Sequence, residues 1–477
     1  MILRKRMTIR GRSGLPKHSD IGIIGFGAMG RNLALNLTEH GFRVAGYDHA
    51  DISGLSEMSV LCRSLPELIE SLATPRTLLM MIPSGPEVDR LIDDLLPFLE
   101  GGDLLADGGN SFFRDTERRA GRVGDAGVEW VDLGISGGWH GARHGPSISA
   151  GGSRSGCARV EAVLGAVSAS VDGERCFARV GPSPGGHFVK MAHNGIEYAA
   201  MQIIAEAYLI MDRLCGLSIS EIQAVFASWS GGEMGSYLIQ ITADILSKRD
   251  SETGKPITEV ILGSARQTGT GRWAAVAALE LGAPAPTLAE AVHARFLSEA
   301  DRPQVSQAGG AGKPAGENAA SQSENLARLK GAVLCSTLCA YIQGFSLLAK
   351  AGKKYGWDFD QGRIAGIWRG GCIVRSSLLG IISDSFRANP SLENLLLAPQ
   401  LARQLESRES PWRHMAREIA RFGIPAPAIM SALAYYSAFV SGSLGGEILQ
   451  AQRDYFGSHG YQRVDRQGTF KTDWLNK

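Results

Sequence analysis

IGIIGFGAMG, residues Ile21 to Gly30, is the stretch that decides the fold of the N-terminal part of this 477-residue chain. Its apolar start is typical of a buried strand, and Gly25, Gly27 and Gly30 follow in the spacing Gly-x-Gly-x-x-Gly. Where a strand turns into a helix, the first glycine permits the tight turn and the second lets backbone N–H groups approach a pyrophosphate. The third lets the helix pack closely on the strand. The pattern predicts a dinucleotide-binding loop made of Gly25, Phe26, Gly27, Ala28, Met29 and Gly30.

The flanking residues extend this turn into a strand–helix–strand unit. A helix is predicted from about Met29 to His40, and the run from Phe42 to Tyr47 predicts the second strand. Further strand candidates lie at Thr77–Ile82, Leu104–Ala106 and Val128–Leu133. Strands that alternate with helical stretches predict an α/β domain with a doubly wound parallel sheet, of the Rossmann type, over residues 21–186.

Asp48 ends the second predicted strand, 18 residues after Gly30. In this fold a carboxylate at that place accepts hydrogen bonds from the ribose hydroxyls of the cofactor and repels a 2′-phosphate. The position therefore favours NAD over NADP, with both kept as candidate cofactors. In the other reading, Asp48 only caps the turn that follows the strand.

The sequence changes texture after GPSPGG, residues Gly181–Gly186. Long amphipathic segments rich in Ala, Leu, Met and Glu replace the strands, and they predict a large all-α domain over residues 187–449. Within it, the Gly/Ala/Gln-rich residues 301–325 are expected to form an exposed loop. Beyond Gln452 an aromatic and charged stretch has no clear helical period, and residues 450–477 are expected to form a C-terminal tail that docks onto another surface.

Composition and charge exclude several classes of protein. The 49 Lys and Arg residues balance 48 Asp and Glu residues, so no long-range field favours nucleic acid or an anionic membrane. No uninterrupted apolar run approaches the ~20 residues of a membrane span, and a soluble protein is expected. The basic residues 1–20 lack the apolar core of a signal peptide and are expected to form a flexible extension.

Seven cysteines are scattered along the chain, which argues against a disulfide framework and for a reducing, cytoplasmic compartment. Cys335 and Cys339 lie one helical turn apart, but no nearby His or Cys pair completes a zinc site. They are predicted to be small buried apolar side chains. No metal is expected.

A polar stripe runs along one predicted helix in the segment GHFVKMAHNGIEYAAMQIIAEAY. Lys190, His193, Asn194, Glu197 and Tyr198 fall within an arc of about 140° at 3.6 residues per turn. A solvated helix face is the alternative, although His, Asn and Tyr are not the Glu/Lys mixture typical of such a face. Lys190 and Glu197 can act as a base and an acid if burial brings their pKa values toward neutrality.

Five stretches in this order resemble the 6-phosphogluconate dehydrogenase family over nearly the whole chain, from about Ile21 to Trp474. They are DGGNS (Asp107–Ser111), SGG with GARHGPS (Ser136–Ser147), FVKMAHNGIEY (Phe188–Tyr198), IWRGGCIVRS (Ile367–Ser376) and QAQRDYFGSHGY (Gln450–Tyr461). The resemblance implies oxidative decarboxylation of 6-phosphogluconate to ribulose 5-phosphate and CO₂ with reduction of NAD or NADP and without a metal. This reaction belongs to the pentose phosphate pathway and to gluconate utilisation.

The resemblance also implies roles for single residues. Lys190 would be the general base for hydride transfer from C3 and later an acid, and Glu197 would protonate C1 of the enediol after CO₂ leaves. Arg295 and Arg453 would hold the phosphate, and His459 would be another substrate contact. The other contacts to the sugar acid would be Asn110, Ser136, Gly137, Gly138, His193, Asn194 and Tyr198, and the cofactor site would also include Ile82 and Asn110.

The resemblance further implies the state of assembly. In the family the C-terminal tail crosses into the partner subunit, so a homodimer is expected in which Arg453 and His459 complete the site of the other subunit. Taken singly, each of these residues also has a purely structural interpretation. Asn110 would be a turn residue, Arg295 a surface charge and Arg453 a cap at the C-terminal end of a helix.

The chain departs from the family pattern around the cofactor. Asp48, His49 and Ala50 stand where the family usually has Asn-Arg-Thr, and Pro83 stands where it has Lys. Both changes remove partners for a 2′-phosphate. They agree with the independent argument for NAD from the charge of Asp48.

Further departures lie near the expected substrate. Thr268 replaces a phosphate-contacting Lys, so weaker phosphate affinity is expected unless Arg266 or Arg272 takes over that contact. Trp139 and His140 replace two Glu residues after Ser-Gly-Gly. These changes keep two alternatives open: a β-hydroxyacid dehydrogenase acting on a different sugar acid, and a catalytically silent dinucleotide-binding protein.

Overall fold

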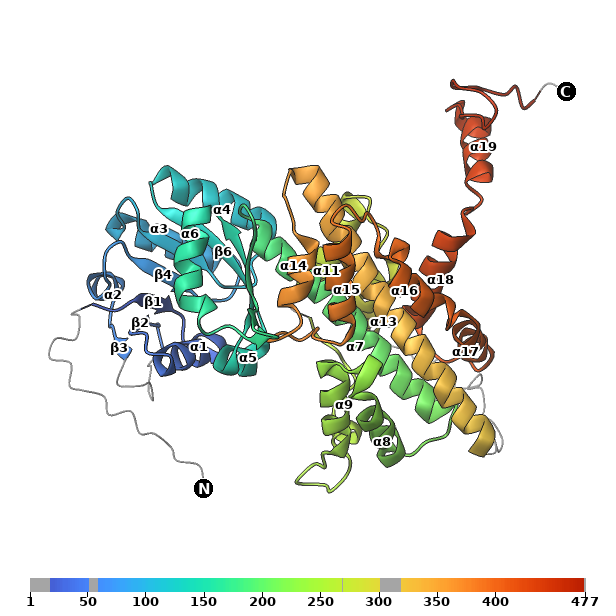
Figure 1. Ribbon diagram of the computed structural model, residues 1–477, viewed down its shortest axis with the longest axis horizontal. Helices are drawn as coiled ribbons and strands as arrows, with labels where there is room; N and C mark the ends of the chain where they lie inside the picture. Colours follow the sequence, from blue (N-terminus) through green and yellow to red (C-terminus); the bar gives the residue numbers. More distant parts are fainter. Residues whose placement is uncertain (1–17, 51–58, 268, 301–318, 476–477) are drawn as a thin grey trace.

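The computed structural model describes residues 18–50, 59–267, 269–300 and 319–475. Most of the expected N-terminal extension (1–17), most of the expected loop (301–318) and Thr268 lie outside the described residues. Figure 1 shows an α/β part beside a larger helical part, with the last helix standing apart from both. The expected fold class, an α/β dinucleotide-binding domain followed by an all-α domain and a tail, is confirmed.

One large sheet forms the core of the α/β part. Within the described residues it has eight strands in the order β10-β7-β6-β5-β4-β1-β2-β3. They are β1 (Ile21–Ile24), β2 (Val44–Tyr47), β3 (Ser59–Leu61), β4 (Thr77–Met80), β5 (Leu104–Asp107), β6 (Glu129–Ser136), β7 (Ser147–Gly152) and β10 (Phe177–Gly181). A separate hairpin consists of β8 (Ser170–Val171) and β9 (Glu174–Arg175).

The strands β1 to β6 pair in parallel, as expected. However, β7 pairs antiparallel with β6, and β10 runs parallel to β7. The expected parallel pairing therefore holds for β1 to β6, whereas β7 and β10 run in the opposite direction. The short connection between Ser136 and Ser147 explains the reversal, because a parallel return needs a crossover of about a dozen residues or more.

Helices cover both faces of this sheet. On one face lie α1 (Ala28–Glu39), α5 (Gly138–His144) and α6 (Arg154–Val160), with a π-helical turn at Glu161–Gly165. On the other face lie α2 (Leu65–Glu70), α3 (Pro86–Leu95), a 3₁₀ turn at Leu96–Phe98 and α4 (Phe113–Asp125). Each face has its own apolar core, in which Leu33 packs with Ile23 on one side and Ile92 with Leu78 on the other. This double burial explains why the strands are almost uniformly apolar.

The helical part begins with α7 (Gly185–Arg213). It continues with α8 (Ile219–Trp229), α9 (Tyr237–Ser247), α10 (Ile257–Val260), α11 (Thr270–Glu280), α12 (Pro286–Glu299), α13 (Ala319–Tyr355), α14 (Gln361–Ile367), α15 (Leu378–Ala388), α16 (Pro399–Glu406), α17 (Glu409–Arg421), α18 (Pro427–Ser441) and α19 (Gly446–Gly457). Short 3₁₀ turns lie at Gly232–Met234 and Leu395–Leu397. This series of helices agrees with the expected all-α domain.

The helix α7 is the central element of the molecule. It packs against β6 and β7 of the sheet and against α11, α12 and α13 of the helical part. Every residue from Gly185 to Ile196 is buried as a result. The alternative of a solvated polar stripe is therefore wrong, because Lys190, His193 and Asn194 all lie in this buried stretch.

The helix α13 changes the expected limits of the exposed loop. It begins at Ala319, so residues 319–325 are helical, and Asn325 is only 5% exposed. The Ala, Ser, Gln and Glu residues of this stretch are compatible with a helix, and the apolar residues that follow bury it against α7. The stretch Ser321–Tyr355 is long and apolar enough to span a membrane, and an 18-residue window within it has a mean hydropathy of 1.6. However, 89% of that window is buried inside the protein. Its apolar residues belong to the core.

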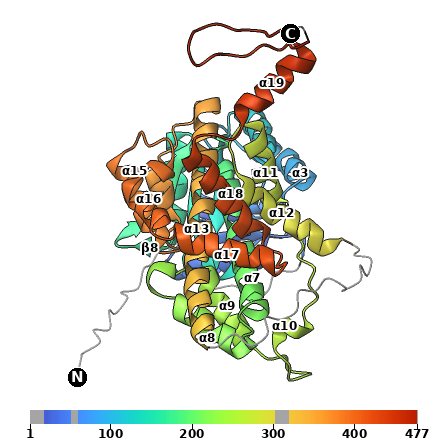
Figure 2. The ribbon, with the colours of Figure 1, turned by 90° about the vertical axis from the view of Figure 1, so that its right-hand side faces the viewer.

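The C-terminal segment is more helical than the sequence predicts. Helix α19 continues to Gly457, beyond the expected end of helical structure at Gln452. The following chain folds back, with Tyr461 paired to Phe470. The Asp454 carboxylate accepts hydrogen bonds from the N–H groups of Gly460 and Thr472 and from Nε1 of Trp474. In both views α19 projects away from the rest of the molecule (Figures 1 and 2).

Candidate active site

The glycine loop between β1 and α1 has the geometry that a bound pyrophosphate requires. Gly25 has φ of +97°, and a Cβ there would lie 2.6 Å from the carbonyl oxygen of Met81. A Cβ at Gly30 would lie 2.0 Å from the carbonyl oxygen of Gly25, whereas Gly27 has open space on its Cβ side. Gly25 and Gly30 thus permit the turn and the close packing, and Gly27 leaves the start of α1 accessible to an anion.

The carboxylate of Asp48 lies beside this loop. Its Oδ2 accepts a hydrogen bond of 2.5 Å from the N–H of Phe26, and its Oδ1 accepts one of 2.9 Å from the N–H of Ala50. Asp48 therefore organises both the glycine loop and the turn after β2. The contact with Ala50 shows that Asp48 does cap the turn after β2. Asp48 also lines the adjacent cavity.

A cavity of about 560 Å³ lies along the carboxyl ends of β1 and β2. Acidic side chains dominate its charged lining, and the guanidinium of Arg90 pairs with Glu87. Such an acidic lining disfavours the binding of a ligand that places a phosphate group in this cavity. The residues around the cavity include Gly25, Gly27, Tyr47, Asp48, His49, Ile82, Pro83, Glu87, Arg90 and Asp94.

A second cavity continues from the glycine loop toward the helical part. Its lining joins both parts of the molecule, because Thr270 comes from α11 and Asn110 from the loop after β5. The other residues around it are Gly27, Ala28, Met29, Met81, Ile82, Pro83, Ser84, Gly108, Gly109 and Ile135. Of the predicted cofactor residues, Phe26 and Gly30 line neither cavity; Phe26 donates to Asp48 and Gly30 packs on Gly25.

Lys190 lies at the junction of the two parts. Its Nζ donates a hydrogen bond of 2.8 Å to Oγ of Ser136, at the end of β6, and the residue is 8% exposed. Burial lowers the pKa of Lys190 below its ordinary value, and the nearby Glu197 carboxylate opposes this shift. A lysine in this setting can give up its proton more readily than one in water.

His193 and Asn194 form a hydrogen-bonded chain behind Lys190. Nδ1 of His193 lies 2.9 Å from Oδ1 of Asn194, and Nδ2 of Asn194 donates to Oγ1 of Thr270 at 2.9 Å. With Asn194 oriented in this way, Nδ1 carries the proton and Nε2 is an acceptor, which is buried and has no partner among the described residues. Burial, followed by the charge of Lys190, holds the pKa of His193 well below its usual range.

Glu197 lies one helical turn beyond His193, with Oε2 3.7 Å from Nδ1 of that ring. Burial raises the pKa of Glu197, and the positive charges of Lys190 and Arg295 partly oppose this effect. The base candidate and the acid candidate on α7 therefore have pKa values shifted in opposite directions, each toward neutrality. Such pairs are typical of acid–base catalysis.

Tyr198 and Arg295 close one side of the site. Cζ of Arg295, on α12, lies 3.6 Å from the centroid of the Tyr198 ring, and its Nη1 donates to the carbonyl of Arg266. Arg295 is therefore a partly exposed charge that is held against the Tyr198 ring. Tyr198 also packs on Gly271, where a Cβ would come within 2.3 Å of its ring.

The loop Ser136–Gly138 is held between β6 and the segment that follows α14. Gly137 has φ of +111°, and a Cβ there would lie 2.3 Å from the carbonyl oxygen of Gly371. Gly138 has φ of +61° and starts α5, in which Trp139 is 62% exposed. Glycine is thus required where this loop passes Gly371.

The structure does not bring Arg453 and His459 to Lys190 within one chain. Both belong to the projecting C-terminal segment, where Arg453 donates to Oε1 of Gln450 and the His459 ring contacts that of Phe456. Figure 1 shows α19 well away from α7 and from the sheet. The side of α19 that carries Ile448, Leu449, Tyr455 and Phe456 is largely exposed.

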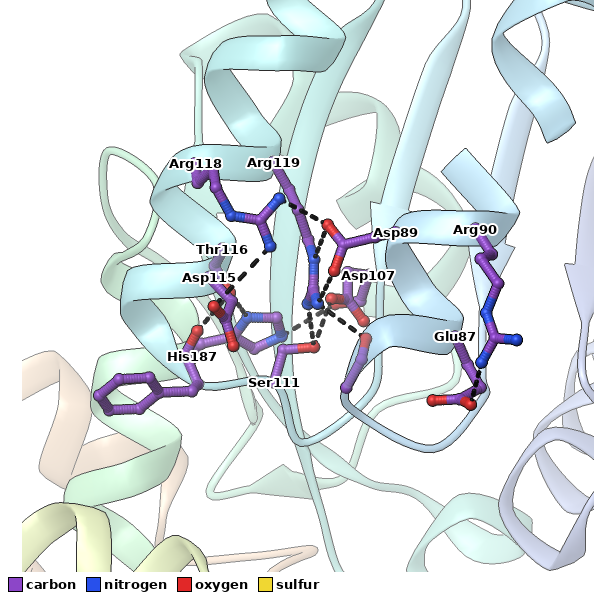
Figure 3. A network of polar contacts seen from close by, with 12 residues as sticks. Glu87, Asp89, Arg90, Asp107, Ser111, Asp115, Thr116, Arg118, Arg119 and His187 are labelled. Carbon is purple, nitrogen blue, oxygen red and sulfur yellow. Dashed lines mark hydrogen bonds and ion pairs between the residues drawn. The ribbon is translucent and has the colours of Figure 1, made fainter. Parts of the chain in front are cut away.

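Sequence reasoning missed a buried polar network next to the site, which includes Arg119, Asp89 and His187 (Figure 3). The motif DGGNS pointed to two of its members, Asp107 and Ser111. No spacing marks Arg119 in the segment FRDTERRAG, because a buried arginine and a solvated one look alike in sequence.

The fold and the site define a class of protein: an oxidoreductase with a glycine loop for a nicotinamide dinucleotide, and with a buried lysine and a partly buried glutamate on one helix. Comparison with known proteins gives the family. A sequence model of the NAD binding domain of 6-phosphogluconate dehydrogenase matches residues 20–181, and one of the 6-phosphogluconate dehydrogenase C-terminal domain matches residues 186–474. The chain belongs to the 6-phosphogluconate dehydrogenase family.

Similar proteins cover almost the whole chain. The NADP(+)-dependent decarboxylating 6-phosphogluconate dehydrogenase of Bacillus subtilis is 43% identical over 96% of this chain and 99% of its own length. The NAD(+)-dependent enzyme of the same organism is 40% identical over the same shares. A solved structure of the Plasmodium falciparum enzyme is 34% identical, has a TM-score of 0.87 and matches 95% of this chain and 100% of its own. The identities to the NADP-dependent and the NAD-dependent enzyme are too similar to indicate which cofactor this chain prefers.

Proposed function

We propose that this chain catalyses the oxidative decarboxylation of 6-phosphogluconate to ribulose 5-phosphate and CO₂, with NAD as the preferred hydride acceptor. The observation that carries the proposal is that the buried Lys190 and the partly buried Glu197 both project from α7 and have pKa values shifted in opposite directions. The full-length match to decarboxylating enzymes supports it over a β-hydroxyacid dehydrogenase or a silent binding protein.

Lys190 acts first, as the general base. Its lowered pKa lets the neutral amine accept the proton of the substrate C3 hydroxyl. The nicotinamide, when bound, accepts the hydride from C3. The resulting Lys190 ammonium then donates its proton to the C3 oxygen as the bond to CO₂ breaks and the enediol forms, and the hydrogen bond to Ser136 keeps Nζ in place.

Glu197 acts last, as the acid. Its raised pKa keeps the carboxyl protonated until the enediol has formed, and it then delivers that proton to C1. Lys190 takes the enediol hydroxyl proton in the same step and ends as the ammonium, while Glu197 ends as the carboxylate. Transfer of one proton from Lys190 back to Glu197 then restores the starting state. The positive charge of Arg295 limits how far the Glu197 pKa rises.

The remaining contacts hold the sugar acid. We assign the carboxylate and hydroxyl contacts to Asn110, Ser136, Gly137, Gly138, His193, Asn194 and Tyr198, and the phosphate to Arg295. The cation of Arg295 and the acceptor Nε2 of His193 support this assignment, because Arg295 acts on Glu197 and the His193 ring lies near Lys190 and Glu197.

We assign the adenosine end of the cofactor to the cavity at Asp48 and the nicotinamide end to the cavity at Asn110. The open side of Gly27, which borders both cavities, supports a pyrophosphate between them. Asp48, Glu87 and Asp94 around the first cavity support NAD, because their charges oppose a 2′-phosphate.

We further propose a homodimer in which Arg453 and His459 complete the site of the other subunit. The projection of α19 and its exposed apolar side support this arrangement, because neither residue reaches the site of its own chain. A cytoplasmic location fits the seven cysteines, all of which are buried thiols. The proposed reaction belongs to the pentose phosphate pathway and to gluconate utilisation.

Initial rates with 6-phosphogluconate test the proposed function. NADH and NADPH formation are followed by absorbance while CO₂ release is measured in parallel. NADH formation matched by an equal amount of CO₂ is expected. Faster NADPH formation would overturn the cofactor preference alone, and reduction of neither cofactor with no CO₂ would overturn the substrate.

A further inference from the structure

Arg119, on α4, is a buried cation outside the proposed catalytic and substrate residues. It is 1% exposed, and its guanidinium makes contacts on three sides (Figure 3). Nε and Nη2 donate to the two carboxylate oxygens of Asp89 at 3.1 and 2.7 Å, and Nη2 also donates to the carbonyl of Gly85 at 2.8 Å. Nη1 donates to Oγ of Ser111 at 3.3 Å.

These contacts connect the two loops that form one wall of the cofactor cavities. Gly85 caps the N-terminus of α3, directly after the lining residues Pro83 and Ser84. On the other side, Ser111 donates to Oδ2 of Asp107 at 2.7 Å and follows Asn110 in the chain. One guanidinium thus sets the distance between the segment 83–85 and the loop that carries Asn110.

The same network reaches the catalytic helix. Oδ1 of Asp107 accepts the N–H of Gly109, and the backbone carbonyl of Asp107 accepts a hydrogen bond of 3.1 Å from Nε2 of His187. His187 is in the first turn of α7, three residues before Lys190, and its Nδ1 contacts Oγ1 of Thr116 at 2.7 Å. The loop with Asn110 is therefore tied to Arg119 on one side and to α7 on the other.

We propose that Arg119, acting through Ser111, is a positioning residue that fixes Asn110 and the 107–111 loop in the place required by the nicotinamide half of the dinucleotide. The inference rests on the proposed function, because it takes the cavity at Asn110 as the nicotinamide end. A planar guanidinium suits this role, since it holds a carboxylate, a carbonyl and a hydroxyl at fixed angles.

The test uses the full-length variants Ser111→Ala and Arg119→Lys, with Arg118→Ala as the control. Arg118 also binds Asp89, at 2.7 Å, but its side chain is 55% exposed and none of its contacts among the described residues reaches the 107–111 loop. Dissociation constants for NADH, NADPH and ADP-ribose are measured by fluorescence titration without substrate. Melting temperature, kcat and KM are measured on the same samples.

Ser111→Ala is expected to weaken binding of the preferred reduced dinucleotide about tenfold and to leave ADP-ribose binding unchanged, because only the nicotinamide side loosens. Arg119→Lys is expected to weaken binding of the preferred reduced dinucleotide and of ADP-ribose, since lysine cannot hold Gly85 and Ser111 together. Arg118→Ala is expected to bind all three ligands as the wild type does.

The inference is overturned if Ser111→Ala binds the dinucleotide as tightly as the wild type, or if it loses ADP-ribose by the same factor as NADH. A fall in melting temperature with unchanged binding would also overturn it, because that result means a purely structural role. Wild-type protein that binds NADH but does not reduce a cofactor with 6-phosphogluconate would instead count against the proposed function alone.

Discussion

Nζ of Lys190 lies 2.8 Å from Oγ of Ser136, so a single hydrogen bond joins the central helix α7 to the end of strand β6. The close approach depends on Gly134, where a Cβ would come within 2.6 Å of Cβ of Lys190. Burial against the sheet is also what lowers the pKa of Lys190. The position of the base and its reactivity therefore come from the same packing of helix on sheet.

Replacing Lys190 tests the general base. Lys190→Gln is expected to lower kcat about 10² to 10⁴-fold, because a base in place contributes that much to proton transfer. Dinucleotide binding is expected to persist, since Lys190 lines neither cofactor cavity. Steady-state rates and NADH titration check this, with the exposed Lys353→Gln as a control. Unchanged kcat in Lys190→Gln would refute the assignment.

The pH dependence of kcat follows from the two opposite pKa shifts. Lys190 must be neutral, so the rate rises with pH through a pKa lowered from 10.5. Glu197 must be protonated, so the rate falls as pH passes a pKa raised from 4.5. Because Arg295 lowers the pKa of Glu197, Arg295→Met is expected to raise the pKa that Glu197 contributes to the profile at saturating substrate. The exposed Arg403→Met serves as the control. A profile in which neither pKa moves in Arg295→Met argues against Glu197 as the acid.

Cofactor preference is expected to depend on the charge of Asp48. Asp48→Asn removes a charge that opposes a 2′-phosphate, and it is expected to raise kcat/KM for NADP relative to NAD about tenfold. Kinetics with both cofactors check this ratio. Asp93→Asn is a matched control, because Asp93 is on the same α3 as Asp94 but does not line the cavity. A ratio unaffected by Asp48→Asn would contradict the prediction.

Mixing two inactive variants tests the shared site. Lys190→Gln lacks the base, and Arg453→Ala lacks the phosphate contact that we assign to the other subunit. After denaturation and refolding together, the hybrid dimer has one intact site, so about one quarter of wild-type activity is expected for random pairing. Each variant refolded alone is the control. If the mixture is no more active than the two variants refolded alone, Arg453 does not contribute to the active site of the other subunit.

Glu206 is expected to make stability depend on pH. It is buried and accepts the N–H groups of Ala428 and Ile429 at the start of α18, and burial raises its pKa to about 7. Because the pKa rises on folding, the stabilisation is complete below the unfolded value of 4.5 and is lost as pH rises to about 7.

In Glu206→Gln this pH dependence should largely disappear, because the amide keeps an acceptor for the helix N–H groups and does not titrate. Melting temperatures between pH 4.5 and 7 check the change in slope. The exposed Glu117→Gln is expected to leave the slope as it is. Equal slopes in the wild type and Glu206→Gln would rule out this role for the carboxylate.

Local sequence patterns determined the parts of the protein that depend on neighbouring residues. The spacing of Gly25, Gly27 and Gly30 predicted the turn between β1 and α1, because the required backbone angles and contacts are local. The period of Lys190, His193 and Glu197 predicted one helix face. The change in texture after Gly181–Gly186 predicted the passage from sheet to helices, since the two structures bury apolar residues at different periods.

Only the tertiary structure decided which distant residues meet. The pairing of β7 with β6 and the start of α13 at Ala319 both depend on burial against other elements, which the local sequence pattern did not predict. The contacts of Lys190 with Ser136 and of Arg119 with Asp89 likewise join separate segments. The pKa shifts at Lys190 and Glu197 exist only once the surrounding helices and strands have removed water from these groups, so their chemistry is a property of the folded chain.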